Sequence, residues 1–287
     1  MRAGLLTPTP ELLAALGLTG AKWQSLGGGD EDSAVFRLET AAAAYALRLR
    51  PARALPALRH EAAAARAAHA AGLPAPEPLR LAVAGGIACL LSTWCPGVPL
   101  AAAVIAGRAD PEALGAACGR LQATLNALPA PSEVRSASPL SWQAAQGREA
   151  LALEGVPGLG KDRLLHLDFH PLNLLTDGRA ITGIVDWSNA GAGDPRQDLA
   201  RSLAILRLDA PNVLEEDPAA AARILAMAEP WRAAYAGAAG PQADMASFLA
   251  WAGLRTVRDL EGKRRPDQLA RMRGEAERWL REAQAQR

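Results

Sequence analysis

The sequence predicts an α+β protein of two lobes, a small strand-rich N-terminal lobe and a larger, mostly helical C-terminal lobe. Two observations favour this division. In the first hundred residues, short alternating segments surround one helical pattern, whereas helical patterns dominate the rest of the chain. A Pro-Gly-Val-Pro segment at 96–99 then marks the junction. We therefore expect an N-terminal lobe at 1–95, a linker at 96–99, and a C-terminal lobe at 100–287.

In the N-terminal lobe we expect strands at AVFRLET and YALRLR, and again at PLRLAV and IACLLSTW around a Gly-Gly turn. Between these pairs the pattern predicts a helix from about Leu55 to Ala71, ended by Gly72 and Pro74. In the C-terminal lobe, Asp110 is a good helix N-cap and is followed by proline, which predicts a helix to about Leu128. Helical patterns return after residue 196 and continue nearly to the end of the chain.

Composition narrows the class of partner. A formal net charge of +1 over 287 residues gives no basic surface for nucleic acid and no signal for an anionic membrane. The uncharged stretch 81–107 is interrupted by Gly-Gly, Pro-Gly and Pro, so a membrane span is not expected there. Half of the residues are hydrophobic, but only 4% are aromatic, as is typical of an Ala-rich helical protein. Small polar metabolites are the expected partners.

The cysteines and the N-terminus predict a cytoplasmic location. The three cysteines are odd in number and lack metal-ligand spacing, so we expect buried thiols instead of a disulfide or zinc site: Cys89, Cys95 and Cys118. At the N-terminus, prolines and a glutamate interrupt the apolar stretch that a signal peptide requires.

Two adjoining segments between Glu154 and Asn173 compete as the phosphate-handling site. The first, GVPGLGKD, approaches a P-loop and depends on Lys161. A P-loop needs a strand before it, a helix after it, and Ser or Thr directly after the lysine. Here Asp162 follows the lysine, and Pro171 lies too near for a helix to begin. We therefore interpret this segment as a Gly/Pro loop entering a strand.

The second segment, HLDFHPLN, leads into a predicted hairpin, LL-TDGR-AITGIV, which ends at Asp186. In an antiparallel hairpin, the residues entering the first strand and leaving the second lie at the same end, so Asn173 and Asp186 should be neighbours. Asp168 lies on the loop that precedes them. Such a set suits Mg²⁺, which prefers oxygen ligands and is often held by one or two protein groups together with substrate phosphates. The alternative, three unrelated turn and capping residues, is less compatible with their order and spacing.

HLDFHPLNLL followed by IVDWSNAGAGDPRQDLA resembles the paired signatures of the aminoglycoside phosphotransferase and choline kinase family. This resemblance extends from about residue 25 to residue 200 and implies a bilobal protein-kinase-like fold. It implies that the lobe at 1–95 binds the nucleotide and that the lobe at 100–287 is catalytic and binds the acceptor, with 96–99 as the hinge between them. It implies Asp168 as the catalytic base, Asn173 and Asp186 as Mg²⁺ ligands, and His166 as a structural support of the catalytic loop.

Three further residues of these motifs have less defined roles. His170, as an isolated histidine, is expected to be hydrogen-bonded structure and not a participant in the chemistry. Asp194 and Asp198 also match family positions, and helix capping is a sufficient explanation for Asp198.

A kinase-like N-terminal lobe needs a cation on a central strand for the phosphates and an acid on the neighbouring helix. Arg48 in YALRLR is the candidate cation and Glu61 the candidate acid. None of the three lysines lies in a plausible strand, and an arginine fork can pair with phosphate or carboxylate. The alternative for Glu61 is a solvated residue near Arg66.

The segment LGGGDEDSAVFRL is expected to cover the phosphates through backbone amides near Gly28 and Gly29. It departs from the family pattern because Ser33 stands where Asn is frequent, and because three acids at 30–32 would repel a triphosphate. Adenine is expected to bind backbone groups of the junction at Thr93, Trp94 and Cys95.

These expectations define an ATP- and Mg²⁺-dependent kinase that transfers the γ-phosphate to a hydroxyl of a small metabolite or antibiotic. The alternative is a nucleotide-binding regulatory protein with the same fold and no turnover, which the acidic loop and the arginine in place of lysine favour. The acceptor stays open. The acidic run at 215–217 is short for a polycation, and the aromatic residues of this lobe have the spacing of core residues: Trp142, Trp231, Tyr235 and Trp251.

Overall fold

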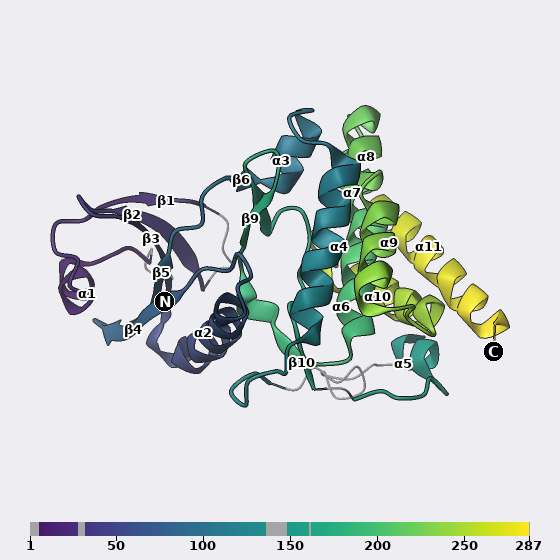
Figure 1. Ribbon diagram of the computed structural model, residues 1–287, viewed down its shortest axis with the longest axis horizontal. Coiled ribbons are helices and arrows are strands. Elements are labelled where there is room, and N and C mark those ends of the chain that lie inside the picture. Colours follow the sequence, from purple (N-terminus) through teal and green to yellow (C-terminus); the bar gives the residue numbers. More distant parts are fainter. Residues whose placement is uncertain (1–5, 28–31, 136–147, 161, 287) are drawn as a thin grey trace. The chain divides into compact units, whose positions relative to one another are not determined.

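The computed structural model describes residues 6–27, 32–135, 148–160 and 162–286 (Figure 1). The chain divides into two compact units, Met1–Cys95 and Pro96–Arg287. Within the described residues, none of the helices is long and apolar enough to cross a membrane.

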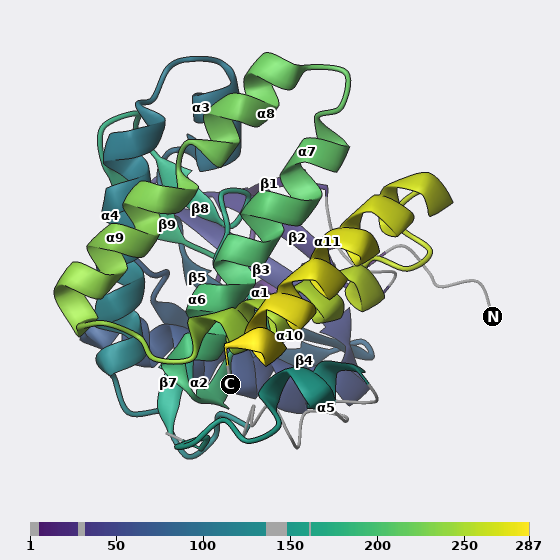
Figure 2. The ribbon, with the colours of Figure 1, turned by 90° about the vertical axis from the view of Figure 1, so that its right-hand side faces the viewer.

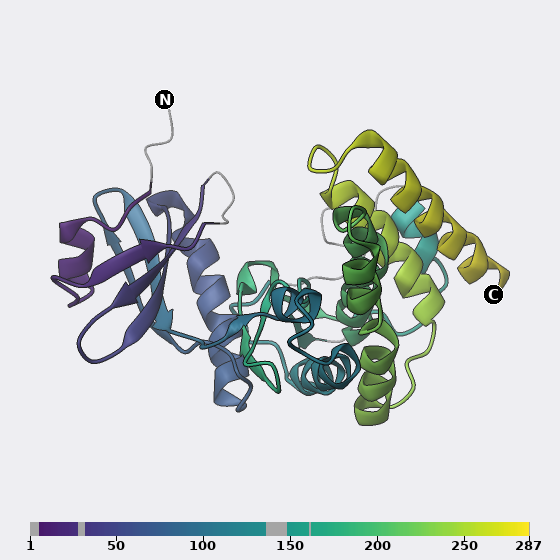
Figure 3. The same ribbon diagram turned by 90° about the horizontal axis from the view of Figure 1, so that it is seen from above.

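The first unit is a five-stranded antiparallel sheet in the order β1-β2-β3-β5-β4. Its strands are β1 (Lys22–Ser25), β2 (Ala34–Glu39), β3 (Ala44–Pro51), β4 (Pro78–Ala84) and β5 (Ile87–Thr93). The short helix α1 (Pro10–Ala15) lies on one face, and α2 (Leu55–Ala70) lies on the other (Figures 1 and 3). The four predicted strands and the predicted helix of this region are confirmed, whereas α1 and β1 have no counterpart among the predicted elements.

The alternation of side chains along β3 decides what each face of the sheet carries. Leu47 and Leu49 are fully buried in the core that α1 covers. Because successive strand residues point to opposite faces, Arg48 lies on the face that α2 covers. Its partner in the sheet register is Leu90, which packs with Leu58 of α2. The strand therefore presents Arg48 to the helix.

The second unit consists mainly of helices, with two small sheets at one side (Figures 1 and 2). Its strands are β6 (Val98–Pro99), β7 (Arg163–Leu165), β8 (Leu174–Thr176), β9 (Ile181–Ile184) and β10 (Gly191–Gly193), in the orders β6-β8-β9 and β10-β7. The expected linker therefore contributes a strand, since residues 98 and 99 pair with β8.

The helices of this unit are α3 (Leu100–Ile105), α4 (Pro111–Ala127), α5 (Arg148–Leu153), α6 (Pro195–Ala204), α7 (Ala210–Val213), α8 (Pro218–Leu225), α9 (Ala228–Ala239), α10 (Met245–Asp259) and α11 (Pro266–Ala285). A π-helical segment, η3 (Ile205–Asp209), continues α6 into α7, and a 3₁₀ turn, η2 (Trp187–Asn189), follows β9. The Asp110 side chain accepts the backbone N–H groups of Glu112 and Ala113, which confirms the predicted cap of α4.

The close packing of α4 against α9 depends on two glycines. A Cβ atom at Gly115 would lie 2.6 Å from the carbonyl oxygen of Met227, and one at Gly119 would clash with the carbonyl of Trp231. This approach lets Trp231 and Tyr235 of α9 reach polar groups of α4: Trp231 donates to Gln122 at 2.8 Å and Tyr235 to Asn126 at 3.1 Å. Both aromatic residues are core residues, as is Trp251, while Trp142 lies outside the described residues.

Candidate active site

The predicted hairpin forms from β8 and β9. Leu174 pairs with Ile184, and the N–H of Val185 donates to the carbonyl of Asn173 at 2.9 Å. Asp186 follows directly, so Asn173 and Asp186 lie at the same open end of the hairpin. At its other end, Asp177 accepts the N–H groups of residues 179 and 180, each at 2.8 Å. The predicted Asp-Gly turn is therefore confirmed.

Asp168 lies on the loop between β7 and β8 and makes close contacts with two loop residues. Its Oδ2 accepts a hydrogen bond from Nδ2 of Asn173 at 2.9 Å, and its carbonyl accepts a second from the same nitrogen at 3.0 Å. Nε2 of His170 lies 3.3 Å from Oδ1 of Asp168. Because the amide nitrogen of Asn173 faces Asp168, the Oδ1 atom of Asn173 lies on the other branch of the carboxamide.

The charge of Asp168 is set by competing effects. Burial alone would raise the pKa of Asp168, but the hydrogen bond and charge of His170, with smaller contributions from His166 and Arg201, hold this pKa below its ordinary value. The carboxylate is therefore ionised at neutral pH and can accept a hydrogen bond from a hydroxyl group.

The backbone at this site adopts an uncommon conformation. Leu167 and Asp186 both have φ of 61°, in the left-handed region that non-glycine residues rarely adopt. Among the described residues, Asp244 is the remaining non-glycine example. Each such residue costs on the order of 1–3 kcal/mol, and such residues cluster at active sites. At Asp186, Oδ1 accepts the Ser188 hydroxyl at 2.7 Å, which fixes the carboxylate at the start of η2.

His166 is fully buried beneath the loop. Its Nε2 lies 3.1 Å from the carbonyl of Val185, and its ring packs against Phe169 and Trp187, with centroid distances of 5.8 and 4.7 Å. Burial lowers the pKa of His166, which opposes the influence of the nearby aspartates, including Asp186. These contacts agree with the supporting role that the resemblance implies for this residue.

The structure corrects the interpretation of Asp198. The N-cap of α6 is Asp194, which forms a capping box with Gln197, so capping does not explain Asp198. Asp198 is fully buried and accepts the N–H of Leu167 at 2.6 Å and that of His166 at 3.3 Å. The prediction was wrong because the motif gives the position of Asp198 in the chain and does not show which distant loop its carboxylate contacts.

Asp198 belongs to a buried polar network that the sequence did not reveal. Asn126 of α4 donates to Oδ2 of Asp198 at 2.9 Å and to the carbonyl of Leu164 at 3.0 Å. The hydroxyl of Tyr235 donates to Oδ1 of Asn126. Two helices, α4 and α9, thus hold the loop between β7 and β8 through α6. The only sequence signal was two polar positions on otherwise apolar helix faces.

In the first unit, Arg48 and Glu61 form an ion pair. Nε of Arg48 lies 3.1 Å from Oε1 of Glu61, and the two side chains are only 14% and 9% exposed. The alternative of a solvated Glu61 is therefore wrong. A buried pair of this kind fixes the direction of the guanidinium, because separating the charges would leave each one unpaired in a low-dielectric environment.

The loop that is expected to cover the phosphates is described only in part, since Gly28, Gly29 and the acids at 30 and 31 lie outside the described residues. The Ser33 hydroxyl is buried and has no hydrogen-bond partner among the residues that the structure describes. Asp32 is exposed and forms an ion pair with Arg53, which offsets its charge.

The expected adenine-binding segment at the end of β5 has one residue committed to the sheet. The N–H of Thr93 donates to the carbonyl of Glu77 at 3.0 Å, and its hydroxyl accepts the N–H of Glu77 at 2.8 Å. The Trp94 ring lies under the guanidinium of Arg37, 4.8 Å from its centroid. Burial raises the pKa of the Cys95 thiol to about 11, so this thiol is protonated at neutral pH. An adenine contact through this segment stays a prediction.

The competing P-loop interpretation fails on local structure. Lys161 itself lies outside the described residues, but the residues after it form strand β7 at Arg163–Leu165 and no helix. A phosphate at a P-loop requires the N-terminus of a following helix. This segment is a loop that enters a strand, as expected.

The residues at the hairpin end fit Mg²⁺ better than a metal that requires a cage of protein ligands. Within the described part of the chain, no group of three or more His, Cys, Asp or Glu side chains could hold a metal ion. Asn173 and Asp186 supply one carboxamide and one carboxylate, both oxygen donors. Mg²⁺ is often held by one or two such groups together with phosphate oxygens and water.

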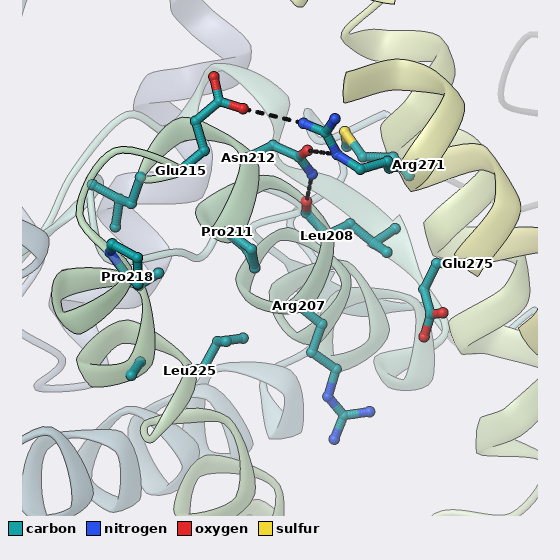
Figure 4. A pocket seen from close by; sticks show the side chains of 13 residues that line it. Arg207, Leu208, Pro211, Asn212, Glu215, Pro218, Leu225, Arg271 and Glu275 are labelled. Carbon is teal, nitrogen blue, oxygen red and sulfur yellow. Dashed lines mark hydrogen bonds and ion pairs between the residues drawn. The ribbon is translucent and has the colours of Figure 1, made fainter. Parts of the chain in front are cut away.

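A cavity of about 620 Å³ opens elsewhere in the second unit, between η3, α7, α8 and α11 (Figure 4). None of the predicted catalytic or metal-binding residues lines it. Its polar side chains are largely paired, since Arg271 contacts Glu215 at 3.2 Å and the side-chain oxygen of Asn212 at 3.2 Å, while Glu275 pairs with Arg278. Size alone therefore does not identify the active site.

The fold and the loop geometry define a phosphotransferase with a protein-kinase-like fold. The chain belongs to the phosphotransferase enzyme family (APH), whose sequence profile matches residues 22–156 and 143–251. The family resemblance, the fold class and the enzyme class predicted from the sequence are thereby confirmed. Among the curated proteins, none matches the chain.

Several solved structures share this fold. One is a thermostable mutant of the aminoglycoside phosphotransferase APH(4)-Ia in ternary complex with AMP-PNP and hygromycin B, with 18% identity, a TM-score of 0.66, and coverage of 96% of this chain and 98% of that one. Another is an aminoglycoside-3'-phosphotransferase of type VIII, with 22% identity, a TM-score of 0.56, and coverage of 84% and 95%. A third is APH(3'')-Id from Streptomyces rimosus, with 18% identity, a TM-score of 0.55, and coverage of 84% and 93%. At these identities the likeness concerns the fold.

Proposed function

We propose that the protein transfers the γ-phosphate of ATP to a hydroxyl group of a small molecule, with Mg²⁺ as cofactor. The observation that carries this proposal is the hydrogen bond between Asp168 and Asn173 at the open end of the hairpin, where Asp186 follows strand β9. This arrangement gives an ionised carboxylate beside two oxygen donors, which is the set that phosphoryl transfer from Mg·ATP requires.

The candidate site residues of the second unit have distinct roles in this proposal. Asp168 accepts a hydrogen bond from the acceptor hydroxyl, orients its oxygen, and takes its proton as the new P–O bond forms. The bond between the γ-phosphorus and the β,γ-bridging oxygen breaks in the same transfer, and ADP leaves. Asn173 and Asp186 would hold Mg²⁺, which supplies neutralisation of the phosphate charge when bound. His166 and Asp198 keep the loop in place and do not contact substrate.

In the first unit, Arg48 would pair with the phosphates while Glu61 fixes its direction. Ser33, whose buried hydroxyl has no partner among the described residues, and the backbone at Gly28 and Gly29 would contact the same phosphates. The complex of APH(4)-Ia with AMP-PNP supports ATP as the nucleotide. A cytoplasmic location, where ATP is supplied, stays a prediction.

The test is Mg²⁺-dependent ATP turnover with a panel of hydroxyl compounds, together with calorimetric titration of nucleotide. Asp186→Ala is expected to remove both Mg²⁺-dependent nucleotide binding and turnover, because it deletes a carboxylate ligand. The matched control is Asp177→Ala, which removes a carboxylate from the opposite end of the same hairpin and should preserve both. If the wild type binds ATP but shows no turnover with any of the acceptors, the chain is instead a regulatory protein with this fold.

A further inference from the structure

A second cavity, of about 100 Å³, adjoins the catalytic loop. One wall is formed by the loop residues His170, Pro171 and Leu172. The other walls come from α3, η3, α7 and α8, which lie together in the second unit (Figure 2). His170 also lies 3.3 Å from Oδ1 of Asp168. The cavity is therefore separated from the proposed catalytic base by a single side chain.

The lining of this cavity is apolar except for two residues. One is His170. The other is Asp209, whose two carboxylate oxygens accept hydrogen bonds from Arg264 at 2.8 and 2.9 Å. The cavity thus offers no unpaired carboxylate to an ammonium group. The nearby acidic run is also largely engaged, because Glu215 pairs with Arg265 and Arg271, and Asp217 caps α8.

Two exposed apolar side chains line the same cavity. Leu172 is 65% exposed and Val213 is 55% exposed, the highest values among the large exposed hydrophobic residues of the described chain. They come from different elements, the catalytic loop and the end of α7. Exposed apolar residues that gather at a concave site are typical of a surface that a ligand covers.

The walls are held in place without a ligand. The N–H of Ala101, at the start of α3, donates to the carbonyl of Pro171 at 2.9 Å. The carbonyl of Ile105, at the end of the same helix, accepts a hydrogen bond from Arg223 of α8 at 2.7 Å. The wall contributed by η3 is π-helical, a local geometry that is frequent at functional sites.

We infer that the acceptor is an alcohol with a compact apolar group near its hydroxyl, and that this group enters the cavity beside His170. The inference rests on the proposed function and names the substrate class of that site. The apolar lining suits a short aliphatic chain or part of an aromatic ring. A polycationic amino sugar finds no unpaired opposite charge there.

The experiment compares ATP turnover on primary alcohols from ethanol to hexanol, on benzyl alcohol, and on hygromycin B as the polycationic probe. Burial of each added methylene is expected to raise kcat/KM by about fourfold until the cavity is filled. Hygromycin B is expected to give no turnover above the acceptor-free rate. Turnover on hygromycin B that exceeds turnover on every alcohol would overturn the inference and leave the proposed function standing.

The variant Val213→Asp tests the place of binding, and its exposed position makes loss of folding unexpected. It is expected to abolish the rise of kcat/KM with chain length. For the longest alcohol that fits, kcat/KM should fall by about tenfold or more relative to the wild type. The matched control is Val83→Asp on β4, which is 49% exposed and lies in the other unit; it should preserve the trend. A trend unchanged in Val213→Asp overturns the cavity assignment. Absence of turnover on every alcohol also overturns it, and calorimetry with Mg·ATP then shows whether the proposed function fails as well.

Discussion

The two units position their candidate functional groups in different ways. In the first, Arg48 projects from strand β3 and Glu61 from helix α2, and the two side chains form an ion pair between these elements. In the second, Asp168 and Asn173 lie on a loop, and a buried carboxylate from a distant helix holds that loop. Regular structure is sufficient to aim the first pair, whereas the second set needs a polar network to fix it.

This difference has an energetic counterpart. The loop of the second unit contains Leu167 in the left-handed region, next to the proposed base. The N–H of that same residue donates to Asp198 at 2.6 Å. A charge-assisted hydrogen bond contributes about 1.5–3 kcal/mol, which is comparable to the cost of the strained backbone. The network therefore offsets strain at the site, whereas Arg48 and Glu61 lie outside the left-handed region and need no such compensation.

The largest effect is expected at the base. Asp168→Asn keeps the shape of the side chain and removes its ability to take a proton, so kcat should fall by about 10²–10⁴-fold. Affinity for Mg·ATP should stay close to that of the wild type, because Asp168 acts on the acceptor. Steady-state kinetics with a working acceptor and calorimetric titration measure the two quantities. Full activity in this variant would show that the catalytic assignment is wrong.

Next in size is the effect of removing the carboxylate that holds the loop. Asp198→Ala leaves the N–H groups of His166 and Leu167 without their acceptor and removes one of the two acceptors of the Asn126 amide, so the free energy of unfolding should fall by about 3–5 kcal/mol. Urea denaturation of wild type and variant measures this change. Asp198→Asn retains one acceptor oxygen and should lose less. A loss below about 1 kcal/mol in Asp198→Ala would mean that the network does not stabilise the loop.

The same contrast explains what could be predicted from the sequence. Strands, helices and the β8–β9 turn follow local rules, and the register of a hairpin is enough to place Asn173 and Asp186 at one end of it. Arg48 and Glu61 could be paired because a kinase-like lobe requires a cation on a strand and an acid on the neighbouring helix, and local patterns located that strand and that helix. Asn126, Tyr235 and Asp198 could not be connected, because their contacts join α4, α9 and α6 across long sequence separations.

The cavity beside the catalytic loop shows a second limit of prediction. Leu172 and Val213 are ordinary apolar residues in the sequence, and a loop or a helix end does not indicate which of its side chains stays exposed. These two residues line one cavity because α3, which donates a hydrogen bond to Pro171, packs against α8, and α8 also contacts α7. Tertiary packing of this kind would determine the proposed acceptor surface, while the motifs indicate only the residues proposed to handle phosphate.

The smallest effects are expected in the first unit, where they separate direct from indirect action. Arg48→Ala removes a charged donor to the phosphates and should weaken Mg·ATP binding by about 10- to 100-fold, as expected for loss of a charge-assisted hydrogen bond of about 1.5–3 kcal/mol. Glu61→Ala leaves Arg48 present but free to turn, so its loss of affinity should be smaller. Calorimetric titration of both variants measures these changes.

Glu61→Gln is the control that distinguishes orientation from charge. It keeps an oxygen acceptor for Nε of Arg48, so its affinity should lie between that of the wild type and that of Glu61→Ala if Glu61 acts by fixing the direction of the guanidinium. Equal losses in Arg48→Ala and Glu61→Ala would instead mean that Arg48 contributes nothing once it is misdirected, and the pair would then act as a single unit. Unchanged affinity in Arg48→Ala would remove Arg48 from the phosphate site, because a cation that contacts the phosphates cannot be deleted without loss of Coulombic attraction.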